Sequence, residues 1–265
     1  MSDMPTDAAA LPPLVPPSLE ALPEYEPSYD GLVTEDHKPV ESILIEKLYR
    51  MLTHTLYASW PGPGAGRHFL VLANVGWFYK EKTPAVVPDC LLSLDVACPQ
   101  ELHVKQGHSY YQWQMGKPPD VVIEAVSDKR GGEDSLKRDL YASPGVPYYA
   151  IYDPEHHLSQ ETLRTLELSG RSYRSAEPGP WPTVGLGLRL WPGVFEGHKD
   201  VWLRWCDANG AIIPTAEESA AILAQRATRA EEQAALQAER SRQAEERVRQ
   251  LEEELRRLKG EGRPT

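Results

Sequence analysis

Two acidic residues in this sequence stand where a carboxylate needs either a compensating partner or a function. Glu124 lies within the apolar run VVIEAV, and Asp89 closes the run AVVPD. A charge in the middle of an apolar strand loses its hydration unless it is paired. Their separation of 35 positions, 124 minus 89, suits two neighbouring strands. Two carboxylates at adjacent strand ends would form the hard-oxygen site that Mg²⁺ prefers, and the carbonyl of Ala125 could supply a third protein oxygen.

A cation close to these carboxylates is expected from the helix that follows. Lys137 belongs to the segment EDSLKRDLYA, directly after the Glu124 strand and one turn beyond Asp134. Its face of the helix can look back at the strand end. There the ammonium group would stabilise charge developing on a phosphate or orient an attacking water.

Other polar residues nearby have simpler interpretations. Asp120 stands four residues before Glu124 on the same strand, so it cannot supply a ligand from a neighbouring strand. We interpret it as a strand-entry residue. Ser127 and Tyr141 are interpreted as satisfying nearby backbone groups rather than positioning a ligand.

Basic residues occur in the connectors around the expected site. Cations at such places would contact a phosphate backbone, so they predict a local basic patch. The alternative is a set of scattered surface cations. The residues are Lys80, Lys82, Lys105, Lys117, Lys129 and Arg130.

Strands and helices alternate around these residues. A helix with one buried stripe is predicted after Pro39 by apolar residues at helical spacing, namely Val40, Ile43, Leu44, Leu48, Met51 and Leu52. Strand-like segments follow at 68–80, 85–96, 108–114 and 118–127. The run VVIEAV is apolar on both faces and predicts the middle of a covered sheet.

A β-α-β unit is predicted next, from the strand at 118–127, the helix at 133–142 and the strand at 146–154. Such units build sheets with helices on their faces. Further strand-like segments continue to residue 215, with a hairpin turn at Asp207–Gly210.

Residues 216–259 contain no Gly or Pro and predict a single helix of about 66 Å. Its heptad seam predicts a weak homotypic coiled coil, most simply a dimer. A solvated single helix with i,i+4 Glu/Arg pairs is the alternative. The two seam series are Leu223, Ala230, Gln237, Ala244, Leu251, Leu258 and Ala220, Ala227, Ala234, Ser241, Val248, Leu255.

Composition narrows the remaining possibilities. Residues 1–32 are acidic and proline-rich, which predicts a disordered arm, and residues 260–265 are expected to form a disordered tail. No apolar run approaches the roughly 18 residues that a membrane span needs. A net charge of -11 argues against nucleic-acid binding over the whole surface. Three cysteines without metal-ligand spacing favour a reducing cytoplasm.

Taken in order, four motifs resemble the PD-(D/E)xK nuclease superfamily. They are Pro88-Asp89, Ile123–Ser127, Asp134–Tyr141 and Gly145–Pro154. More narrowly, the chain is similar to the Uma-type restriction endonuclease family from about His37 to Thr215, including the segments GLGLRLW and WLRWCDANG. The heptad tail also resembles extensions carried by some members. The resemblance implies a restriction-endonuclease-like α/β domain over residues 33–215, with a mixed β-sheet core flanked by helices.

The same resemblance implies a chemistry. Asp89 and Glu124 would hold Mg²⁺, with Mn²⁺ as an alternative, to activate water for in-line attack on a phosphodiester of DNA. The superfamily has lysine two positions after the glutamate, where this chain has Val126. The resemblance implies that Lys137 has taken over that role. Some superfamily members add a carboxylate near the first helix, which makes Glu41 a candidate accessory residue.

A second class of function remains open, a catalytically inactive nuclease-fold scaffold whose coiled coil mediates protein–protein contacts. The acidic balance and Val126 favour this scaffold. The retained Asp89 and Glu124 favour an enzyme. A retained divalent-metal site would discriminate between the two.

Overall fold

The computed structural model describes residues 42–127, 132 and 135–261, and the side chains up to residue 257. The predicted arm at 1–32, together with Glu41, Lys129 and Arg130, lies outside the described residues. In chain order the elements are α1 (Ile43–Ser59), β1 (Phe69–Ala73), β2 (Trp77–Phe78), β3 (Cys90–Leu94), η2 (Lys105–Gly107), β4 (Tyr110–Tyr111), α2 (Gln112–Met115), β5 (Val121–Ala125), α3 (Leu136–Ala142), β6 (Tyr148–Tyr152), β7 (Leu163–Ser169), β8 (Ser172–Ala176), β9 (Leu186–Phe195), β10 (His198–Asp207) and α4 (Ala216–Glu261).

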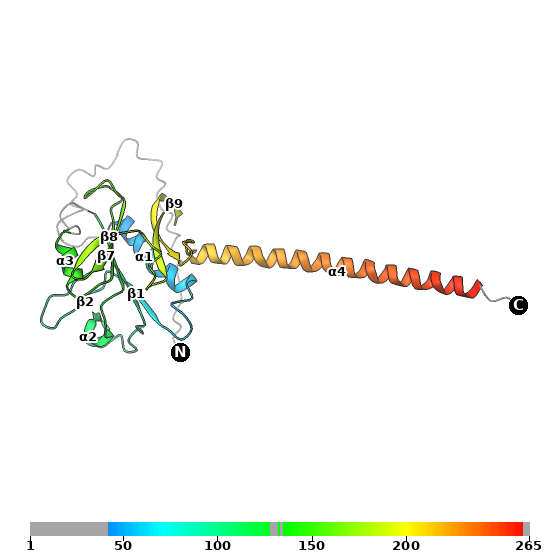
Figure 1. The fold of residues 1–265 in the computed structure, drawn as a ribbon, viewed down its shortest axis with the longest axis horizontal. Coiled ribbons are helices and arrows are strands. Elements are labelled where there is room, and N and C mark those ends of the chain that lie inside the picture. Colours follow the sequence, from blue (N-terminus) through cyan, green and yellow to red (C-terminus); the bar gives the residue numbers. More distant parts are fainter. Residues whose placement is uncertain (1–41, 128–131, 133–134, 262–265) are drawn as a thin grey trace, which may run out of the picture. The chain divides into compact units, whose positions relative to one another are not determined.

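The centre of the fold is a six-stranded mixed sheet in the order β1-β3-β5-β6-β7-β8 (Figure 1). Only β5 and β6 run parallel, joined through α3, and the other neighbours in this sheet are antiparallel. All five residues of β5 are buried. The predicted α/β class, the β-α-β unit and the central place of the VVIEAV strand are therefore confirmed.

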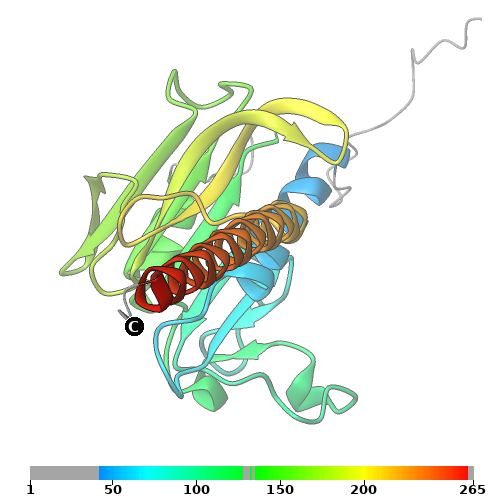
Figure 2. The same cartoon turned by 90° about the vertical axis from the view of Figure 1, so that its right-hand side faces the viewer.

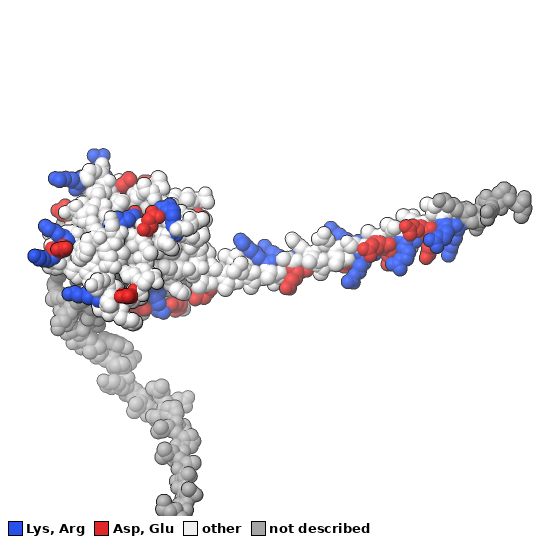
Figure 3. Space-filling model, turned by 90° about the horizontal axis from the view of Figure 1, so that it is seen from below, with Lys and Arg blue, Asp and Glu red and all other residues white. Residues whose placement is uncertain are grey.

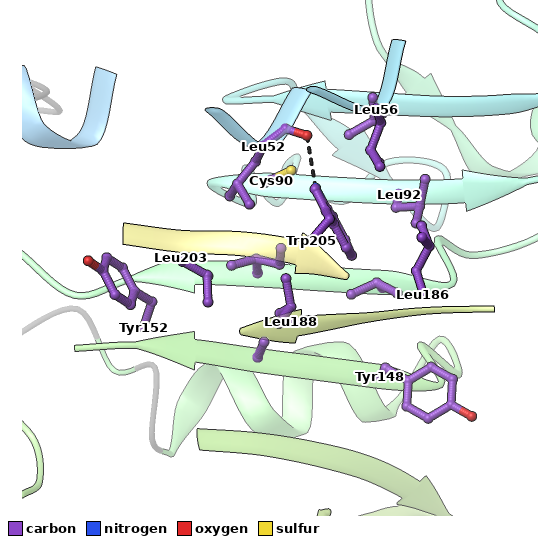
Figure 4. Packing of buried hydrophobic residues seen from close by; sticks show 14 of the residues in the cluster. Leu52, Leu56, Cys90, Leu92, Tyr148, Tyr152, Leu186, Leu188, Leu203 and Trp205 are labelled. Atoms are coloured by element: carbon purple, nitrogen blue, oxygen red, sulfur yellow. Dashed lines mark hydrogen bonds between the residues drawn. The ribbon is translucent and has the colours of Figure 1, made fainter. Parts of the chain in front are cut away.

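The sheet carries a hydrophobic core on each face. One core joins α1 and the β9–β10 hairpin to the sheet, and Figure 4 shows Trp205 Nε1 donating to the carbonyl of Leu52 at 2.9 Å within it. The curved hairpin is yellow in Figure 2. The second core includes Tyr141 of α3 and Val122, Tyr149 and Ile151 of the sheet. Alternate residues of β5 therefore face different cores, and Glu124 shares the α3 face with Val122.

Helix α1 starts later than predicted. Ser42 is its N-cap, and the Ser42 hydroxyl accepts from the N–H of Ile45 at 3.2 Å. Such a cap satisfies an N–H group that has no partner within the helix. The buried stripe is as predicted at Leu48, Met51 and Leu52, and differs only in the first turn, where Ile43 is 78% exposed and Ile45 is buried instead.

Two predicted strands are interrupted. The segment 68–80 divides into β1 and β2 after Asn74, whose φ of 52° is a left-handed conformation that ends the extended chain. The segment 108–114 has two strand residues, and its remainder enters the short helix α2. The turn predicted at Asp207–Gly210 is confirmed, because the Gly210 N–H donates to the carbonyl of Asp207 at 2.9 Å.

Helix α4 begins with a capping box formed by Thr215 and Glu218. The Glu218 N–H donates to the Thr215 hydroxyl at 3.2 Å, and the Thr215 N–H donates to the Glu218 carboxylate at 2.8 Å. Glu218 also pairs with the buried Arg204 of β10 at 2.9 Å, which ties the first turn to the hairpin.

From Ala220 to Arg257 every side chain of α4 is exposed. The helix continues to Glu261, two residues beyond its predicted end, because residues of the last turn still donate to carbonyls one turn earlier. The predicted tail at 260–265 therefore begins with two helical residues. None of the helices in the described ranges combines the length and apolar character that crossing a membrane requires.

Candidate active site

The strand register places the two predicted carboxylates opposite each other. The last residues paired between β3 and β5 are Cys90 and Ile123. One step further along this antiparallel register, Asp89 faces Glu124. The prediction that the two residues lie on neighbouring strands is confirmed, and the site forms where β3 begins and β5 ends.

Asp89 is held by two donors from different elements. Its Oδ1 accepts from the Tyr49 hydroxyl of α1 at 2.7 Å, and its Oδ2 accepts from the Ala125 N–H of β5 at 2.7 Å. The Asn74 N–H donates to the backbone carbonyl of Asp89 at 3.2 Å. Three contacts thus fix the half-buried Asp89 side chain and backbone against the end of β5.

Glu124 is fully buried and receives two donors from α3. Lys137 Nζ lies 2.8 Å from its Oε2, and the Tyr141 hydroxyl donates to its Oε1. Residues 137 and 141 are four apart, so they share one face of the helix. The expectation that Lys137 looks back at the strand end is met. The interpretation of Tyr141 as a backbone partner is wrong, because its hydroxyl is directed at the carboxylate.

The charges around the buried Glu124 carboxylate act in opposite directions. Burial and the neighbouring Asp89 carboxylate raise the pKa of Glu124 well above its ordinary value, and Lys137 opposes them. Burial also raises the pKa of Tyr141, and the Glu124 charge adds to this effect, so the phenol remains a donor. A positive ion between the two carboxylates would relieve their repulsion.

The donor set suits a hard cation that keeps part of its water. Among the described residues there is no group of three His, Cys, Asp or Glu side chains able to hold a metal ion. The site offers two carboxylates and the adjacent Ala125 carbonyl. Mg²⁺ is commonly bound through one or two carboxylates, with waters and phosphate oxygens completing the octahedron. Each carboxylate oxygen accepts at least one hydrogen bond within the chain, and an ionised carboxylate has about four lone-pair sites in all.

Of the residues predicted to form a basic patch, Lys117 lies away from the two carboxylates. Lys117 lies at the start of β5, at the opposite end from Glu124, where its Nζ pairs with Asp120 at 2.6 Å. Asp120 also accepts from the Leu94 N–H at 2.7 Å, as a strand-entry residue would. The remaining candidates are exposed in connectors or lie outside the described ranges. Lys80, Lys82 and Lys105 are exposed, as is Ser127.

Sequence reasoning missed two residues near the site, Tyr49 and Arg164, and gave a third, Tyr141, the wrong role. Tyr49 and Tyr141 hold the carboxylates, and Tyr141 was signalled by its i+4 spacing from Lys137. Arg164 of β7 pairs across the sheet with Ile151, which pairs with Glu124. Residues paired in this way point to the same face. The half-buried Arg164 thus belongs to the same row as the carboxylates, a relation that only the strand order reveals.

Comparison with known proteins gives one match. Residues 36–188 match the family model described as "Uma2: Putative restriction endonuclease". The matched segment is more than half of the 265 residues and contains Asp89, Glu124 and Lys137. It ends within β9, short of Thr215, to which the resemblance was expected to extend. No curated protein matches the chain.

Proposed function

This chain belongs to the Uma2 family, and we propose that it is a divalent-cation-dependent endonuclease that hydrolyses phosphodiester bonds in DNA. The observation that carries the proposal is the convergence of Asp89, Glu124 and Lys137 from β3, β5 and α3. Two carboxylates can hold a divalent ion that activates water, and a lysine beside them can stabilise charge on a phosphate, which together would support phosphodiester hydrolysis.

Each residue has a distinct proposed role. Asp89, Glu124 and the Ala125 carbonyl would hold Mg²⁺ or Mn²⁺, which when bound supplies charge stabilisation and a more acidic water. Lys137 reaches Glu124 at 2.8 Å while its side chain stays 26% exposed, so it can also contact a phosphate. Tyr141 is a positioning residue that keeps Glu124 oriented.

Arg164 is the proposed second phosphate contact. It lies two strands from Glu124 in the same row, about 10 Å away at the usual strand spacing of about 4.8 Å. A DNA strand that crosses this row of residues could contact both groups. Arg164→Gln should therefore weaken DNA binding and reduce its dependence on salt. The basic connector residues remain further proposed contacts, and the double variant Lys129→Glu with Arg130→Glu tests them by the same measurement.

The decisive experiment is cleavage of supercoiled plasmid and single-stranded DNA with Mg²⁺ or Mn²⁺. The comparison is between the wild-type chain, Glu124→Ala and the exposed-carboxylate control Glu161→Ala. Loss of cleavage in Glu124→Ala alone supports the proposal. Equal cleavage by all three would trace the activity to a contaminant or another site.

The scaffold alternative is favoured by one observation. Glu124 is completely buried and both of its oxygens already have donors within the chain. Calorimetric titration with Mn²⁺ discriminates between the two functions. Binding that is lost in Asp89→Asn supports the nuclease, whereas wild-type protein that neither binds Mn²⁺ nor cleaves DNA supports the scaffold.

A further inference from the structure

We propose that α4 forms a parallel, in-register, two-stranded coiled coil with a second copy of this chain. The apolar seam is free to accept a partner. Val248, Leu251 and Leu255 are 55%, 46% and 52% exposed, and they occupy heptad positions a, d and a when Ala220 is taken as a. A β-branched residue at a with leucine at d favours two strands. The proposal is independent of the nuclease proposal.

The charges beside the seam identify the partner. In a parallel coil the g residue of one helix faces the e residue five positions later on the other helix. In this register Arg226, Arg240 and Arg247 occupy g positions, and Figure 3 shows charges of both signs along the helix. Their opposite e positions hold Glu231, Glu245 and Glu252. Three oppositely charged pairs therefore recur on each side of a symmetric dimer, so a second copy is complementary.

The three arginines have no comparable role within a single helix. Side chains three or four positions apart interact on a helix surface. No acidic residue stands three or four positions from Arg226, Arg240 or Arg247. In the described part of α4 these arginines form no ion pair, and Arg247 contacts only Gln250, at 3.5 Å. A single solvated helix therefore gives no physical reason for arginine to recur at the g positions.

The same charges specify the orientation. An antiparallel pairing would bring g positions against g positions and e positions against e positions. It would oppose arginine to arginine along one side, as for Arg240 and Arg247, and glutamate to glutamate along the other. A parallel pairing joins both chains at the same end of the coil, where Glu218 ties α4 to Arg204. If the proposed function holds, the dimer carries two catalytic sites.

Charge reversal in the full chain tests the pairing by sedimentation equilibrium. The wild type should be a dimer. One variant carries Arg240→Glu with Arg247→Glu, and a second carries Glu245→Arg with Glu252→Arg. Each should weaken dimerisation roughly tenfold or more, and an equimolar mixture should restore a dimer containing one copy of each. A matched control, Arg242→Glu with Arg249→Glu, makes the same charge change at b positions and should keep the wild-type dissociation constant.

Disulfide trapping tests the orientation. Ala227→Cys places a small residue at an a position near the start of α4, in a Cys98→Ser background because Cys98 is exposed. Oxidation should link two chains through position 227, while Thr228→Cys at the adjacent b position should not link. The proposal is overturned by a monomeric or trimeric wild type, by charge variants that dimerise as the wild type does, or by a dimer that fails to link at 227.

Discussion

Removing the Tyr141 hydroxyl tests whether Tyr141 orients the Glu124 carboxylate or only packs through its ring. Tyr141→Phe keeps the ring that stacks on Trp77 and meets Tyr149 edge-on, but it deletes the donor to the buried Glu124 carboxylate. A hydrogen bond to a charged group contributes about 1.5–3 kcal/mol, and one between neutral groups about 0.5–1.5 kcal/mol. We expect Tyr141→Phe to lower the free energy of unfolding by about 1.5–3 kcal/mol at neutral pH.

A double-mutant cycle of Tyr141→Phe with Glu124→Gln tests whether this cost comes from the hydrogen bond to the carboxylate. In the Glu124→Gln background the side chain at 124 is neutral, so Tyr141→Phe should cost about 1 kcal/mol. Urea unfolding followed by tryptophan fluorescence measures all four chains, at one chain concentration because self-association contributes to stability. The control is Tyr173→Phe, which deletes a buried hydroxyl donating to the Val146 carbonyl at 2.8 Å.

The control should cost the same in both backgrounds, because its acceptor is neutral and separate from Glu124. If Tyr141→Phe also costs the same in both, its effect comes from packing and the positioning role is refuted. Cleavage supplies a second readout, since Tyr141→Phe should lower the rate while Tyr173→Phe leaves it unchanged.

Three further predictions concern the charged side chains of Lys137, Glu218 and Asp153. Under the proposed function the Lys137 ammonium beside Glu124 stabilises the phosphate, so Lys137→Ala should lower the plasmid cleavage rate roughly 100-fold or more and Lys137→Arg should keep part of it. The Arg204 hydrogen bonds lower the pKa of Glu218. The Arg204–Glu218 pair therefore stabilises the fold fully above about pH 4.3, the ordinary value, and loses this contribution as the pH falls through the lowered pKa. The difference in the free energy of unfolding between the wild type and Glu218→Gln should accordingly shrink to zero on acidification. Burial alone would raise the pKa of Asp153, but three backbone N–H donors lower it, and Asp153→Asn should reduce the free energy of unfolding by about 1.5–3 kcal/mol in urea titrations at neutral pH.

The central strands and helices could be predicted because the spacing of apolar residues in each segment agrees with the faces that are buried in the fold. The VVIEAV strand is apolar on both faces and lies inside the sheet. Helix α3 ends at Ala142, and Gly145, at φ 91°, turns the chain toward β6 three residues later. The same consistency placed Asp89 and Glu124 on adjacent strands. In α1 the helical spacing correctly identified Leu48, Met51 and Leu52 as buried, but at the first turn it named Ile43, which is exposed, and missed Ile45.

The partners of the carboxylates were harder to predict because they depend on long-range geometry. Tyr49 reaches Asp89 from a helix 40 positions earlier, and no local pattern marks it as a donor. Arg164 joins the row only through the order β5-β6-β7. Sequence spacing can propose the charged pair, but the residues that orient it emerge when the strands are assembled.

The net charge of the chain does not decide between nuclease and scaffold. Residues 1–41 contain nine of the 39 acidic side chains and one of the 28 basic ones, so eight of the eleven net negative charges precede Ser42. Residues 42–265 hold 30 acidic and 27 basic side chains, a net charge of -3, which opposes DNA binding far less than -11 would. The acidic balance therefore loses its weight as an argument for the scaffold. What remains for the scaffold is Val126 and the burial of Glu124. Because a cation would counter the repulsion that raises the pKa of Glu124, Mn²⁺ binding is the measurement that bears on both functions.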